Sequence, residues 1–195
     1  MRHDPHCTDV HPVMGIASRL SLLCGVLAAA AAVAAGSVAP AAAATSAGTT
    51  VSASASLEAA VLAELNAVRR AHGLKPLRRS GALAAAAGVH SRAMAQHGFF
   101  QHDSRDGSSF AERVRRFYGP SGHRSWSVGE NLLWATSVSA AAAVELWMQS
   151  PAHRRNILTP HWREIGLSAV RAADAPGVFR GRDVVIITSD FGVRG

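Results

Sequence analysis

The chain has 195 residues, with 20 basic and 13 acidic side chains and a formal net charge of +7. Residues 1–56 are dominated by Ala, Ser, Val and Gly and have no amphipathic period, so they cannot build a second core. We therefore expect one globular domain over residues 57–195. The two cysteines, Cys7 and Cys24, both precede it. This excludes a disulfide scaffold, a thiol nucleophile and a Cys-based metal site from the domain.

The N-terminal segment is typical of an export signal. Arg19 supplies the positive end, residues 20–35 are apolar and uncharged, and residues 41–44 are small, as a signal peptidase requires. We predict a cleaved signal peptide over residues 1–44, a flexible Ser/Ala/Thr linker over 45–56, and a secreted, extracellular protein without a transmembrane anchor after cleavage. The alternatives are an uncleaved anchor and a lipoprotein modified at Cys24.

The positive charge is carried by scattered arginines rather than by one basic arm. Lys75 is the only lysine after the prefix, and the arginines recur in pairs such as Arg69-Arg70 and Arg154-Arg155. This pattern favours a solvated surface and argues against a specific nucleic-acid site. Attraction to an anionic cell-wall polymer follows from the net charge alone.

Helical spacing and capping residues predict five helices. The first spans 57–72, with Ser56 as its cap and His72-Gly73 as its end. Ser80 caps the second, which Gly98 ends and whose apolar stripe carries His90 and His97. The others are predicted at 109–118, at 139–149 and, in a short helix, from Pro151 with Ser150 as its cap.

Strands are predicted mainly in the second half of the chain. Residues 126–134 form a strand or an extended edge, and 165–170 alternate as a half-buried strand does. Residues 184–187 are apolar at every position, which is typical of a strand covered on both faces. A loop over 172–181 joins the last two strands. These elements predict an α+β sandwich with an antiparallel sheet between helical layers.

Several motifs, in order, resemble one family. They are Leu65-Asn66-Ala67-Val68-Arg69, His72-Gly73-Leu74-Lys75-Pro76-Leu77, Gly98-Phe99-Phe100-Gln101-His102, Gly129-Glu130-Asn131-Leu132, the run from Trp147 through Ser150-Pro151-Ala152-His153 to Leu158, Ile165-Gly166, and Asp190-Phe191-Gly192. Together they resemble the CAP superfamily of cysteine-rich secretory proteins, antigen 5 and pathogenesis-related proteins, in its bacterial SCP-like extracellular branch. The resemblance covers essentially all of 57–195 and implies a three-layer α-β-α sandwich with a small, mainly antiparallel central sheet.

The resemblance also implies a cleft with two histidines and two glutamates that sometimes holds a divalent metal. Carried over, the histidines are His102 and His153, and the first glutamate is Glu130 of Gly-Glu-Asn. The position of the second glutamate in animal and plant members is Ser150 here. Glu145 is a weak substitute, because positions 145 and 150 lie about 140° apart around a helix. Ser150 is therefore expected as a polar wall of the cleft and Glu145 as a solvated flank residue; a helix rotated from the family pose would instead place Glu145 in the cleft.

The metal prediction names His102 and His153 as ligands, with zinc as the candidate ion. His153 is the third residue of its predicted helix, where the helix dipole favours the neutral imidazole that a metal requires. The competing interpretation is structural: the Glu130 carboxylate accepts hydrogen bonds from His153 or from nearby backbone amides and pins a loop to a helix. The chain has no His-Glu-x-x-His motif that would favour the metal.

The sequence is compatible with three functions. The first is a monomeric extracellular module whose cleft binds a small amphipathic, lipid-like or cell-wall ligand, as the resemblance implies. The second is a hydrolase in which a metal or the Glu/His pair activates water. The third is electrostatic attachment to an anionic polymer with an inert cleft. No residue pattern demands catalysis.

Overall fold

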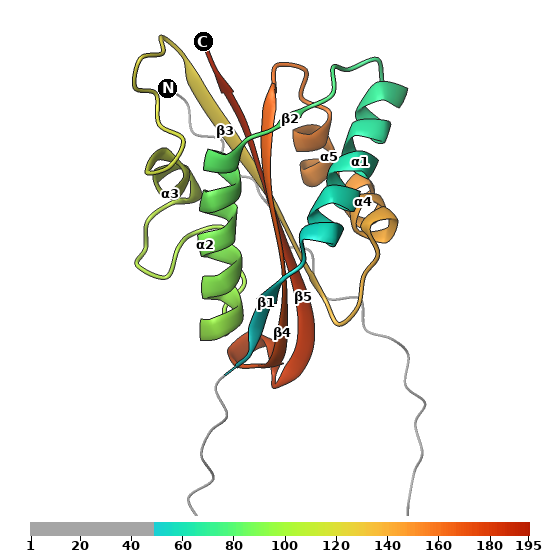
Figure 1. Ribbon diagram of the computed structural model, residues 1–195, viewed down its shortest axis with the longest axis vertical. Helices are drawn as coiled ribbons and strands as arrows, with labels where there is room; N and C mark the ends of the chain where they lie inside the picture. Colours follow the sequence, from blue (N-terminus) through green and yellow to red (C-terminus); the bar gives the residue numbers. More distant parts are fainter. Residues whose placement is uncertain (1–48) are drawn as a thin grey trace, which may run out of the picture. The chain divides into compact units, whose positions relative to one another are not determined.

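The computed structural model describes residues 49–195 (Figure 1). The elements, in chain order, are β1 (Val51–Ala53), α1 (Ala55–Ala71), β2 (Arg78–Arg79), α2 (Gly81–His97), α3 (Phe110–Arg115), β3 (Trp126–Ala135), α4 (Ala140–Gln149), α5 (Pro151–Ile157), β4 (Glu164–Ala175), a 3-10 turn (Gly177–Phe179) and β5 (Arg182–Arg194). The predicted signal peptide lies outside the described residues. No helix within 49–195 is long and apolar enough to cross a membrane.

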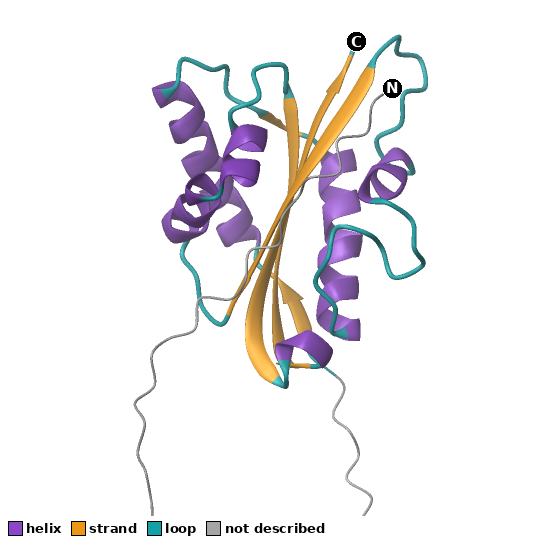
Figure 2. Cartoon of the chain, turned by 180° about the vertical axis from the view of Figure 1, so that it is seen from behind, coloured by secondary structure: helices purple, strands orange, loops and turns teal. Residues whose placement is uncertain are grey.

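The strands form one sheet in the order β1-β4-β5-β3, with antiparallel neighbours, and β2 adds a short parallel pairing to β4. Helices α2 and α3 cover one face, and α1, α4 and α5 cover the other (Figure 2). This confirms the predicted α+β, three-layer sandwich with a mainly antiparallel central sheet.

The strand β5 shows why two helical layers are needed. Val185 and Ile187 pack into the core under α1 and α4, whereas Val184 and Ile186 pack with Met94 of α2. Successive side chains of a strand point to opposite faces, so an unbroken apolar run requires a cover on each side. The expectation for residues 184–187 is confirmed.

The strand β4 corrects the prediction of a half-buried strand over residues 165–170. All six residues are buried. The alternation of large and small side chains reflects the close approach of α2: a Cβ atom at Gly166 would overlap the backbone of Leu83 and Ala84. The small residues therefore mark a helix contact, not a solvent face. The predicted loop over 172–181 is also shorter, because β4 continues to Ala175.

Most predicted helix ends are correct. The side chains of Ser80, Ser109 and Ser139 accept hydrogen bonds at the starts of α2, α3 and α4. Gly98 ends α2 with φ +67°, a left-handed conformation that glycine adopts without strain. α3 is shorter than expected and ends at Arg115.

The start of the domain and the Ser150 cap need correction. The linker predicted over 45–56 is wrong at its C-terminal end, because Val51–Ala53 pairs with β4 and α1 already begins at Ala55, before the predicted cap Ser56. Short polar sequences lack a strong strand signal, and tertiary pairing decides such cases. Ser150 occupies the N-cap position of α5, yet its side chain makes no capping hydrogen bond.

A buried arginine fixes α5 relative to α1. Arg69 of α1 is fully buried and donates to the backbone carbonyls of Ile157 (2.6 Å), Thr159 (3.0 Å) and Lys75 (3.0 Å). Asn66, one turn earlier, exchanges two hydrogen bonds with the backbone of Leu77. These contacts hold the C-terminal end of α5 in place and so help position His153.

The contact at Gly166 generates a stability prediction. Gly166→Ala is expected to lower the free energy of unfolding by about 3 kcal/mol, because a methyl group at this position overlaps helix backbone that cannot move away cheaply. The matched control is Gly81→Ala, where a Cβ meets nothing within 4 Å. Urea unfolding measures both variants. Equal stability of Gly166→Ala and the wild type would contradict the close packing of α2 on β4.

Candidate functional site

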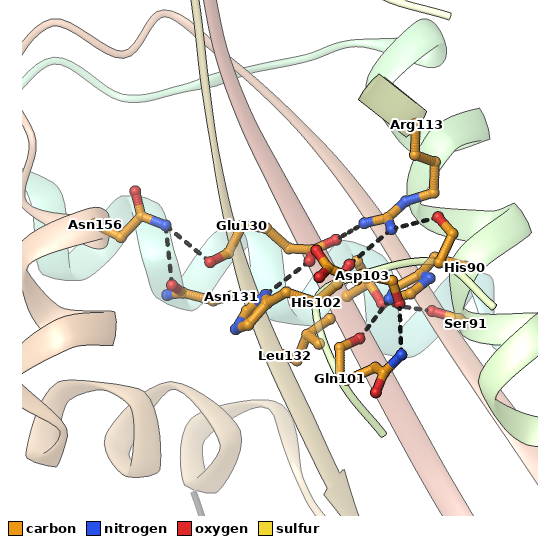
Figure 3. Close-up of polar contacts among 12 residues, drawn as sticks. His90, Ser91, Gln101, His102, Asp103, Arg113, Glu130, Asn131, Leu132 and Asn156 are labelled. Carbon is orange, nitrogen blue, oxygen red and sulfur yellow. Dashed lines mark hydrogen bonds and ion pairs between the residues drawn. The ribbon is translucent and has the colours of Figure 1, made fainter. Parts of the chain in front are cut away.

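The site is built around the Gly-Glu-Asn sequence of the edge strand β3. Glu130 and Asn131 are both buried, and adjacent side chains of a strand point to opposite faces. Glu130 contacts the α3 side of the sheet, and Asn131 contacts α5 on the other side (Figure 3). The motif therefore connects the two helical layers across the sheet.

The carboxylate of Glu130 is shared by two cationic or proton-donating side chains. His102 Nδ1 donates to Glu130 Oε1 at 2.8 Å, and the Arg113 guanidinium donates to Oε2. The side chain of Glu130 has no exposed surface, and that of Arg113 is only 4% exposed. Arg113 also donates to the backbone carbonyl of His102 (2.9 Å) and to the hydroxyl of Ser104 (3.1 Å). One arginine thus holds both the carboxylate and the loop that carries His102.

The charge on Glu130 is stabilised in spite of its burial. Burial alone would raise the pKa of this carboxyl, since it disfavours the charged form. The hydrogen bond from His102 and the positive charge of Arg113 outweigh burial and hold the pKa of Glu130 below its usual range. Glu130 is therefore an ionised carboxylate at neutral pH.

A second histidine, His90 of α2, supports the loop before His102. Its Nε2 lies 2.8 Å from the carbonyl oxygen of Gln101, to which it donates. Burial lowers the pKa of His90 to about 4, so the ring is neutral at physiological pH. His90 is buried in the core, whereas His97 is exposed and lies beside Arg105.

On the other face of the sheet, three hydrogen bonds join the Gly-Glu-Asn sequence to α5. Asn131 Nδ2 donates to the carbonyl oxygen of His153 at 3.2 Å. Asn156 Nδ2 donates to the Glu130 carbonyl and to Asn131 Oδ1, both at 3.0 Å. The Gly-Glu-Asn sequence and the α5 sequence, 22 to 26 residues apart, are thus bound to each other.

The structure brings some predicted site residues together and separates others. His102 and Glu130 are in direct contact, and buried His153 meets the motif through its backbone carbonyl. Glu145 is exposed on α4 and accepts a hydrogen bond from Gln149 at 3.3 Å, as expected for a solvated flank residue. Ser150 is half-buried at the start of α5.

The contacts of Glu130 bear on the metal that the resemblance implies. Within residues 49–195, no group of three or more His, Cys, Asp and Glu side chains is placed to hold an ion. The donor chemistry agrees: both oxygens of Glu130 are engaged, and the Arg113 guanidinium supplies the positive charge beside them. The Glu130 carboxylate accepts from His102 of the loop and from Arg113 of α3, which joins that loop to a helix.

Sequence reasoning missed two residues of this group, Arg113 and Asp190. Arg113 lies among other arginines in a short helix, and nothing in the local sequence separates it from its exposed neighbours. Asp190 had a usable signal, because it follows the apolar run 184–187 in the same strand. A carboxyl inside such a run needs a partner on an adjacent strand.

The fold and the Gly-Glu-Asn site define the class: an α-β-α sandwich whose edge strand binds both helical layers. The model of the CAP family, the cysteine-rich secretory protein family, matches residues 62–188, and the chain belongs to this family.

Relatives and solved structures agree with this assignment. Over 115 residues the chain is 33% identical to the uncharacterized protein YkwD and 30% identical to the uncharacterized membrane protein YlbC, both of Bacillus subtilis. These matches cover 59% and 58% of this chain but only 43% and 32% of the relatives, so the chain spans less than half of their length. An extracellular SCP-domain protein of Bacillus anthracis is 25% identical, with a TM-score of 0.52 over 70% of this chain and 40% of that one. An outer surface protein of Borrelia burgdorferi shares the fold, at 17% identity and a TM-score of 0.56 over 69% and 90% of the two chains.

The buried ion pair generates a prediction for Arg113→Met. Removing the guanidinium leaves a buried carboxylate without its cation, and we expect a loss of about 3 kcal/mol in the free energy of unfolding at pH 7. Arg116→Met is the control. Arg116 forms its ion pair with Asp106 (3.6 Å) in solvent, where both side chains are exposed, so its removal leaves no buried charge. Urea unfolding at several pH values measures both.

The stability loss caused by Arg113→Met should depend on pH. The lowered pKa of Glu130 contributes stability that is present above the ordinary glutamate pKa and is lost as the pH falls through the folded value. In Arg113→Met a protonated Glu130 no longer needs the cation, so the deficit relative to the wild type should shrink in acid. A deficit that is the same at every pH would show that packing, not charge, is responsible.

Proposed function

We propose that this protein is a secreted, extracellular binding module that takes a small amphipathic, lipid-like ligand at His102. The observation that carries the proposal is the contact of His102 with a fully engaged Glu130 carboxylate. A carboxylate held by both an imidazole and a guanidinium is a structural anchor and has little basicity left to activate water. The imidazole it orients is suited to hold a polar group.

The surroundings of His102 supply the apolar part of such a site. The His102 side chain is 17% exposed, and its ring meets that of Phe110 edge-on at 6.4 Å. Phe99 and Phe100, just before Gln101-His102, are half-buried and pack against the core beside α2. An orienting polar group beside an aromatic ring, here Phe110, is a common feature of small-molecule sites.

Two further features support an extracellular role. An extracellular SCP-domain protein of Bacillus anthracis is a structural neighbour, and the sequence predicts a signal peptide. The net charge of +7 would draw the protein, acting as a monomer, to anionic cell-wall polymers through long-range attraction. In this proposal the charge concentrates the protein at the wall, and the His102 site provides selectivity.

A matched pair of histidine variants tests the ligand site. We expect wild type and His97→Ala to bind lysophospholipid or a long-chain fatty acid alike in a tryptophan-fluorescence titration, since His97 lies exposed at the end of α2. His102→Ala should bind at least about tenfold more weakly, the loss of about one charge-assisted hydrogen bond. Equal affinity of all three proteins, or no binding of these amphiphiles by the wild type, would overturn the proposal.

A hydrolase is the second candidate, and one observation favours it: a carboxylate holds His102 at Nδ1, as carboxylates orient general-base histidines. The same titration should be followed by product analysis with ester and peptidoglycan-fragment substrates. Binding without turnover supports the module. Turnover that disappears in His102→Ala and persists in His97→Ala would establish the enzyme instead.

A further inference from the structure

Asp190 of β5 lies directly beside the site but has no role in any of the functions above. In the sheet register it is opposite Glu130 of β3 on one side and Gly166 of β4 on the other. Opposed residues of an antiparallel pair place their side chains on the same face, with Cβ atoms about 5 Å apart. Asp190 has no exposed surface. Two carboxyl groups are therefore buried side by side.

The hydrogen bonds around Asp190 and Glu130 indicate that one of these two carboxyl groups carries a proton. No N–H or O–H group within residues 49–195 donates to either carboxyl oxygen of Asp190. The carboxyl of Asp190 instead faces that of Glu130 directly across the antiparallel pair of β5 and β3. Two ionised carboxylates can only accept, so a hydrogen bond between them requires that one of them be protonated. Glu130 already receives His102 and Arg113, which favour its ionised form.

We propose that Asp190 is a neutral carboxylic acid that donates its proton in a hydrogen bond to Glu130 and so positions this carboxylate for His102. Asp190 is a positioning residue: it acts on His102 only through Glu130. The proposal rests on contacts inside the protein and holds whether or not the site binds an amphiphile.

The charges around Asp190 agree with this assignment. Arg113 of α3 balances one negative charge, which Glu130 supplies, and His90 of α2 is neutral. His102, from the loop before α3, already faces Glu130, and β4 presents only Gly166. A second carboxylate would be buried without a counterion, which costs several kcal/mol. Burial, and next the negative charge of Glu130, raise the pKa of Asp190 well above its usual range.

The test compares a neutral mimic with a truncation. Asp190→Asn keeps the size and a hydrogen-bond donor, whereas Asp190→Ala removes the donor. We expect the wild type at pH 7 to show the infrared carbonyl band of a protonated carboxylic acid, and Asp190→Asn to lack it. The nitrogen NMR signals of the His102 ring should stay at wild-type positions in Asp190→Asn and move in Asp190→Ala.

Stability against pH gives an independent readout. A raised pKa contributes stability that is full below the unfolded pKa, about 4, and is lost as the pH rises through the folded value. Asp190→Asn has no such group, so its Tm should rise relative to the wild type from about pH 4 towards neutral. A constant difference in Tm would overturn the proposal.

The wild-type protein itself allows a test without any substitution. The carbon NMR signal of the Asp190 carboxyl can be followed with pH in the labelled wild-type protein. A signal of the neutral acid that persists at pH 7 supports the assignment. A carboxylate signal at pH 7 refutes it.

Discussion

The carboxylate of Glu130 is the group on which the site depends. It is buried on an edge strand, and an isolated buried charge would be strongly unfavourable. Its partners come from separate parts of the chain: Arg113 from α3, His102 from the loop before it, and Asp190 from β5. The cost of burying the charge therefore makes the arrangement specific, because the carboxylate is satisfied only when these segments are all in place.

The same strand solves a second problem, the exposed edge of a sheet. An edge strand presents unpaired carbonyls that invite further strand pairing. In β3 the carbonyl of Glu130 accepts from Asn156, and that of Leu132 accepts from Trp147 Nε1 at 2.9 Å. Side chains of α5 and α4 thus close this edge. The edge carbonyls bind the α4/α5 layer, while the Glu130 side chain binds the α2/α3 side.

The sequence was sufficient for the layers because hydrophobic periodicity and capping are local. Ser80, Gly98 and the apolar run in β5 each act through their immediate neighbours or through simple alternation. Burial of β4 was not predictable in this way, since Gly166 looks like a polar-face residue until α2 is seen against it. β1 was missed for a similar reason: its three residues form a strand only because β4 is there to pair with them.

Sequence reasoning did not identify the cation that pairs with Glu130, because many arginines in the chain are equally plausible partners. The motifs placed His102 and Glu130 together correctly, but the cation beside them could have been any of many arginines, and only the path of α3 selects Arg113. This choice also decides the chemistry. The Arg113 guanidinium occupies the carboxylate with fixed, directional donors. The site is therefore preorganised around an internal ion pair, in which the Glu130 carboxylate holds the His102 imidazole on one oxygen and the Arg113 guanidinium on the other.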